Sequence, residues 1–140
     1  MKKRIVAIIM TLCLMFSLVP ATVHAAQVEP IQPMWDNTMT FTANLGFSST
    51  DGSVTVYIRG QSSVTNITAD VKLFYKNTAG IWVEIENDWV YSTNQRYLTI
   101  TEHFEGESGC EYKIEVSGTV TMNGYAEAIS KTATATCPGT

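Results

Sequence analysis

Residues 110–137 read CEYKIEVSGTVTMNGYAEAISKTATATC, and this stretch decides the fold. Asn123-Gly124 lies near its centre, and Asn-Gly is the strongest short sequence signal for a two-residue turn between antiparallel strands. On both sides of the turn, apolar and polar residues alternate with the period of two that a half-buried strand requires. We therefore predict a β-hairpin formed by residues 110–120 and 125–137.

The register of this hairpin predicts that its two cysteines face each other. With a two-residue turn, facing residues have numbers that sum to 247, as those of Cys110 and Cys137 do. Facing residues in a hydrogen-bonded pair have Cα atoms about 5.5 Å apart, which a disulfide tolerates. We predict a Cys110–Cys137 disulfide, since no CxxC spacing or neighbouring histidine favours a metal-binding or redox role.

The same register gives the hairpin two chemically different faces. Tyr112, Ile114 and Val116 share the cysteine face, on which Glu127 and Lys131 are polar exceptions. A half-buried hairpin needs one mainly apolar face, so this face is expected to point into the core. A bulge in strands of this length could shift the register by one residue.

The segments before the hairpin alternate in the same way and predict an all-β domain over residues 38–140. The turn signals between them are Asp51-Gly52 and residues 77–80, and no segment has the pattern of an amphipathic helix. About seven antiparallel strands with frequent turns favour a two-sheet sandwich. The five strands expected before the hairpin are residues 38–48, 53–60, 66–76, 81–91 and 96–103.

The first 25 residues have the layout of a signal peptide. Lys2, Lys3 and Arg4 precede an apolar run over residues 5–19, and Ala25 ends a stretch typical of a cleavage site. Cleavage after Ala26 is the near alternative. The apolar run is shorter than the roughly 20 residues that cross a bilayer, which disfavours a membrane anchor. We expect a secreted protein with an extended arm at residues 26–37 and no membrane insertion after cleavage.

Charge argues against a nucleic-acid partner. Cleavage leaves 115 of the 140 residues, with thirteen acidic and six basic side chains and a net charge of −7. Binding to phosphates uses clustered lysine and arginine, so this acidic balance disfavours nucleic acids and anionic membrane surfaces. The expected partner is an extracellular protein or glycan.

An aromatic and acidic group on the predicted strand 81–91 is the main candidate for a ligand platform. Trp82, Glu84, Glu86 and Asp88 alternate onto one strand face, where a tryptophan could stack on a sugar or peptide. Paired carboxylates also serve as acid and base in glycoside hydrolases. Neighbours at i and i+2 are more often an exposed polar face, so we predict no catalytic residues and no enzyme.

Two further patterns are weaker. Glu105, Glu107 and Glu111 lie near glycines in a loop that could surround Ca²⁺, but the DxDxDG spacing is missing. His103 is the only histidine left after cleavage, and no GxSxG turn accompanies it. We expect a loop histidine, no bound metal and no cofactor.

Several short motifs lie at particular positions of the predicted strands. They are Leu73, Lys76, Gly80-Ile81-Trp82, Trp89 and GCEYKIEV at residues 109–116. This outline resembles that of small secreted uncharacterised proteins of Gram-positive bacteria, over most of residues 38–136. The resemblance implies an immunoglobulin-like sandwich and a bacterial source, and it brings no activity or catalytic residue. The antibody-type order of Cys, Trp and Cys is missing, since both remaining cysteines lie on the last hairpin.

These observations predict a secreted, non-enzymatic β-sandwich that acts as a binding, adhesion or envelope-associated module. A secreted effector that acts on other cells, in the manner of a bacteriocin, is the alternative. A glycan-active enzyme is the third hypothesis and rests on the acidic residues alone.

Overall fold

The computed structural model describes residues 35–139. The predicted signal peptide and most of the predicted arm therefore lie outside the described residues. The part of the chain that is described contains no helix long and apolar enough to cross a bilayer. Trp35, near the end of the predicted arm, lies with its ring centroid 5.5 Å from that of Phe41.

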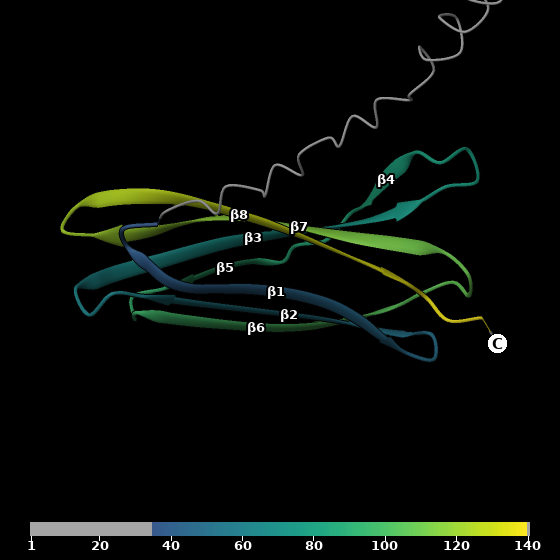
Figure 1. Ribbon diagram of the computed structural model, residues 1–140, viewed down its shortest axis with the longest axis horizontal. Helices are drawn as coiled ribbons and strands as arrows, with labels where there is room; N and C mark the ends of the chain where they lie inside the picture. Colours follow the sequence, from purple (N-terminus) through teal and green to yellow (C-terminus); the bar gives the residue numbers. More distant parts are fainter. Residues whose placement is uncertain (1–34, 140) are drawn as a thin grey trace, which may run out of the picture. The chain divides into compact units, whose positions relative to one another are not determined.

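Within residues 35–139, eight strands form two antiparallel sheets, which confirms the predicted all-β sandwich (Figure 1). The three-stranded sheet has the order β1-β2-β6. The five-stranded sheet has the order β4-β3-β7-β8, with β5 also paired to β3. The strands are β1 (Thr38–Ser48), β2 (Asp51–Gly60), β3 (Val64–Lys76), β4 (Trp82–Ile85), β5 (Val90–Thr93), β6 (Tyr97–Glu105), β7 (Glu111–Met122) and β8 (Tyr125–Thr136).

The last hairpin has the predicted register. Glu111 pairs with Thr136 and Met122 with Tyr125, so every pair of numbers sums to 247. Asn123 and Gly124 both have positive φ, of 52° and 80°, as a two-residue turn between twisted strands requires.

The first predicted turn was wrong. Ser49 and Thr50 connect β1 to β2, with Ser49 at a φ of 58°, whereas Asp51 and Gly52 begin β2. Gly52 is instead required for packing, because a Cβ atom there would lie 2.4 Å from the ring of Phe104.

The predicted strand 81–91 is two strands, which explains why there are eight rather than about seven. β4 and β5 pair with different parts of β3, and residues 86–89 connect them. In this connection the Asn87 side chain donates to the carbonyl oxygen of Ile85 and accepts from the amide of Trp89. A side chain that bonds its neighbouring backbone in this way competes with the strand ladder.

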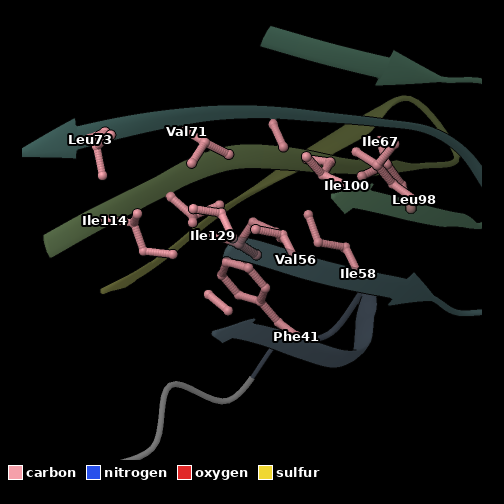
Figure 2. Close-up of a cluster of buried hydrophobic side chains, with 14 of the residues drawn as sticks. Phe41, Val56, Ile58, Ile67, Val71, Leu73, Leu98, Ile100, Ile114 and Ile129 are labelled. Carbon is pink, nitrogen blue, oxygen red and sulfur yellow. The ribbon is translucent and has the colours of Figure 1, made fainter. Parts of the chain in front are cut away.

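The core lies between the two sheets, as Figure 2 shows for Phe41 and Val56 on one side and Val71 and Ile114 on the other. Alternate residues of β2, β3 and β7 are buried and form this core, as the period of two of a β-strand requires. The fully buried side chains include Ile58, Ile67, Leu73, Ile100, Ile114, Val54, Val56, Val71, Val116 and Val120.

Side-chain hydrogen bonds join the two sheets where β8 approaches β1. The two polar exceptions on the cysteine face of the hairpin make these bonds. Glu127 accepts from the amides of Asp36 and Asn37 and from the hydroxyl of Thr38, and Lys131 donates to a β1 carbonyl oxygen. Inward-pointing charges on an edge strand also discourage its pairing with another chain.

Candidate functional site

The side of the five-stranded sheet that points away from the core carries the most concentrated group of aromatic and charged side chains. Alternation buries Val71 and Leu73 of β3, so the residues between and after them point outward. We call this surface the outer face. It comprises Lys72, Phe74 and Lys76 of β3, Trp82 and Glu84 of β4, and Glu111, Lys113 and Glu115 of β7.

Lys113 lies at the centre of the outer face. Its side chain is only 18 % exposed, and its Nζ is 2.5 Å from a carboxylate oxygen of Glu115. The same nitrogen lies 4.5 Å from the ring centroid of Phe74 and 5.1 Å from that of Trp82. Both distances are within the range of cation–π attraction, so the ammonium group fixes the position of two aromatic rings.

Trp82 contacts a second lysine. The Nζ atom of Lys76 lies 5.2 Å from the Trp82 ring centroid and 2.8 Å from a carboxylate oxygen of Glu111. The half-exposed pair Lys72 and Glu84 extends the network, with a distance of 3.3 Å between nitrogen and oxygen.

Each of the three lysines on the outer face therefore has a glutamate partner. The face contains equal numbers of positive and negative side chains, although the chain as a whole is acidic. Such a surface neither attracts nor repels a large charged partner strongly, and its polar groups remain able to form hydrogen bonds.

An open groove of about 410 Å³ continues from this network across β3, β7 and β8. It shares Lys72 and Glu115 with the outer face, and Ser117, Ser130 and Thr132 supply hydroxyl groups. Serine and threonine hydroxyls both donate and accept hydrogen bonds, so the groove presents both kinds of polar partner.

The predicted platform of Trp82, Glu84, Glu86 and Asp88 is only partly assembled. Trp82 and Glu84 share the outer face on β4, but Glu86 and Asp88 belong to the connection between β4 and β5 and lie outside both strands. All three carboxylate residues are exposed, and Glu84 pairs with Lys72. The four residues therefore do not form one strand face.

The glutamates of the possible calcium site interact with different partners. Glu105 accepts a 2.6 Å hydrogen bond from Thr50, whereas Glu111 pairs with Lys76 on the outer face. Within residues 35–139, no group of three or more His, Cys, Asp or Glu is arranged to hold a metal ion. Glu105, Glu107 and Glu111 are thus not gathered into one such group in the described part of the chain.

Glu105 and Glu107 instead line a separate open cleft of about 420 Å³, together with Tyr75, Ile85 and Tyr112. The Tyr112 hydroxyl accepts a 2.8 Å hydrogen bond from the amide of Glu107 and holds the loop in place. Burial, more than the nearby acidic groups, raises the pKa of Tyr112.

His103 lies on strand β6 and not in a loop. Its side chain is exposed, and its Nδ1 atom is 3.3 Å from a carboxylate oxygen of Asp51.

Cys110 and Cys137 lie opposite each other, as predicted, but both are free thiols and the predicted disulfide is not formed in this structure. The Cys137 amide donates to the Cys110 carbonyl oxygen at 2.9 Å, and the Gly109 amide donates to the Cys137 carbonyl oxygen at 3.0 Å. Gly109 has a φ of 81°, so the two residues Gly109 and Cys110 oppose Cys137 in a bulge. This bulge lies beyond the ladder and does not change the hairpin register.

The two cysteines differ in accessibility. Cys137 is fully buried beside Gly106, whereas Cys110 is partly exposed. Burial raises the pKa of the Cys137 thiol, and the neighbouring Cys110 and Glu105 raise it further.

Phe74 and Lys113 were missed as site residues from sequence. A usable signal was present, because Phe74 is an aromatic residue between Lys72 and Lys76 on the polar face of its strand. The pairing of Phe74 with both Glu84 and Lys113 depends on strand neighbours that are distant in sequence.

Comparison of the chain with protein-family models, curated proteins and solved structures found no match. The assignment of function therefore depends on the geometry of the site.

Proposed function

We propose that this chain is a secreted, non-enzymatic, immunoglobulin-like sandwich that binds an uncharged glycan outside the cell through its outer face. The proposal is supported chiefly by the pair of aromatic rings, Phe74 and Trp82, positioned by Lys113 beside a hydroxyl-lined groove. Sugar rings combine apolar C–H surfaces with hydroxyl groups, so they match aromatic side chains next to hydrogen-bonding groups.

Charge balance on the outer face supports the choice of an uncharged glycan. The three lysines are each within 3.3 Å of a glutamate oxygen, so a highly charged polymer would have to displace these pairs. A neutral sugar can add hydrogen bonds at the exposed edges of the pairs without breaking them.

Strand order supports the immunoglobulin-like assignment. The order β1-β2-β6 in one sheet and β4-β3-β7-β8 in the other corresponds to strands A-B-E and C′-C-F-G of that fold. The resemblance to small secreted proteins of Gram-positive bacteria, together with the leader-like N-terminus, supports export from a bacterial cell.

A pull-down with insoluble polysaccharides tests the proposal. Cellulose, chitin, xylan and mannan are incubated with the protein, with Trp82→Ala and with Tyr125→Ala. Tyr125 is a suitable control because it is an exposed aromatic residue at the tip of the last hairpin. We expect retention on at least one polysaccharide and a loss of about tenfold or more in affinity for Trp82→Ala only. Absence of retention on every polysaccharide, or equal losses in both variants, would contradict the proposal.

A further inference from the structure

We propose that Cys110 and Cys137 are a two-step oxidation site, in which Cys110 reacts first with an external disulfide and Cys137 then closes the intramolecular bridge. This goes beyond the glycan-binding proposal and does not depend on it. The inference rests on the opposed positions of the two residues and on the large difference in their exposure.

The backbone geometry favours bond formation between the two residues. The hydrogen bond from the Cys137 amide to the Cys110 carbonyl oxygen holds them side by side in the bulge just beyond β7 and β8. Facing residues of neighbouring antiparallel strands have Cα atoms about 4.5–5.5 Å apart, which is within the range that a disulfide tolerates. Closing the bond therefore requires no separation of the strands.

Access determines the order of the two steps. Cys137 is 0 % exposed and lies under Gly106, where a thiol oxidant in solution cannot reach its sulfur atom. Cys110 is partly exposed at the end of a loop, with its sulfur 3.8 Å from a carboxylate oxygen of Glu107. Exchange proceeds through a mixed disulfide on the accessible thiol, and here that thiol is Cys110.

The chemical steps balance with a small disulfide such as oxidised glutathione as the oxidant. The Cys110 thiolate attacks one glutathione sulfur, forms a mixed disulfide and releases one glutathione thiolate, which takes up a proton. The Cys137 thiolate then attacks the Cys110 sulfur and releases the second glutathione in the same way. Two protein thiols are oxidised and one glutathione disulfide is reduced to two thiols.

The buried position of Cys137 does not prevent the second step. Its raised pKa keeps the thiolate population small, which slows reaction with reagents in solution. Attack of the Cys137 thiolate on the mixed disulfide at Cys110 is an intramolecular reaction, however. The effective concentration of that disulfide therefore far exceeds that of a dissolved reagent. The product ties the chain just after β8 to Cys110, at the end of the loop between β6 and β7.

The test follows reaction of the reduced, folded protein with oxidised glutathione by mass spectrometry, with Cys13 replaced by serine in every sample so that Cys110 and Cys137 are the two thiols followed. The wild-type chain is expected to lose the mass of two hydrogen atoms and both free thiols. Cys137→Ser is expected to accumulate a mixed disulfide with one glutathione. Cys110→Ser is expected to react at least about tenfold more slowly than Cys137→Ser, because its remaining thiol is buried.

A denatured sample provides the control. In guanidinium chloride the two single variants are expected to react at similar rates, which assigns the difference in the folded state to burial. The proposal is overturned if the folded wild-type chain keeps two free thiols or acquires two glutathiones. Equal rates for the two folded variants, with native circular dichroism spectra, would also overturn it.

Discussion

The carboxylate of Glu127 on β8 accepts a 2.6 Å hydrogen bond from the hydroxyl of Thr38 at the start of β1. The same carboxylate accepts from the amides of Asp36 and Asn37, so a residue that interrupts an apolar strand pattern joins the two sheets. Asn37 and Thr38 are both nearly fully buried, so the Asn37 backbone amide and the Thr38 hydroxyl depend on this partner.

Removal of this carboxylate is expected to destabilise the sandwich. Glu127→Ala should lower the free energy of unfolding by about 2–3 kcal/mol, because buried donors lose their acceptor. Guanidinium unfolding of the variant and of wild type measures the difference. Glu86→Ala, which removes an exposed carboxylate between β4 and β5, is the matched control and should change stability by less than about 0.5 kcal/mol. Similar losses in both variants would show that Glu127 has no special role.

Gly52 gives a second prediction, which separates packing from turn formation. Gly52→Ala should lower the free energy of unfolding by about 1–3 kcal/mol, because the new Cβ overlaps the Phe104 ring. Gly46→Ala on β1 is the control, since a Cβ there meets only Ser53, at 4.0 Å. Thermal unfolding of the two variants distinguishes them. If Gly52→Ala is as stable as Gly46→Ala, Phe104 does not pack on this position as described.

Alkaline pH provides a third prediction. The hydroxyl of Tyr91 on β5 donates to the Glu102 carboxylate on β6, at the sheet edges away from β1 and β8. This hydrogen bond is the main reason that the pKa of Tyr91 is raised from 10.0 to about 12, and burial and repulsion between anions add to it. The stabilising contribution is fully present below pH 10 and is lost as pH rises toward 12, where the folded protein releases the proton.

Ultraviolet titration of the tyrosinate absorbance tests this assignment. The late phase near pH 12 should be larger by one tyrosine in wild type than in Tyr91→Phe, in which the buried Tyr112 keeps its own raised pKa. The difference in unfolding free energy between the two proteins should shrink between pH 10 and pH 12. A late phase of equal size in the two proteins would contradict the proposed hydrogen bond.

The fold was largely predictable because its signals are local. Asn123-Gly124 fixes one hairpin, and alternation within each strand identifies the buried face. The turn at Asp51-Gly52 was wrong because the same glycine satisfies a packing requirement set by Phe104, more than 50 residues away in sequence. The break near Asn87 was missed because a side chain that bonds its own backbone leaves the alternation of residues 81–91 unchanged.

The candidate site was less predictable than the fold. Trp82 was identified from its acidic neighbours, but two of those neighbours lie off the strand, and the ring of Trp82 lies next to Lys76 and Lys113. These contacts follow from the pairing of β3 with both β4 and β7. A single sequence gives the face of each strand but not which strands are adjacent in the sheet.

Chemical-shift mapping tests the proposed use of the outer face most directly. The ¹⁵N-labelled protein is titrated with soluble oligosaccharides prepared from the polysaccharides of the pull-down. We expect saturable shifts of the Trp82 indole N–H and of the amides of Lys113, Ser117, Ser130 and Thr132. Shifts confined to the loop at residues 106–109, or no shifts with any oligosaccharide, would contradict it.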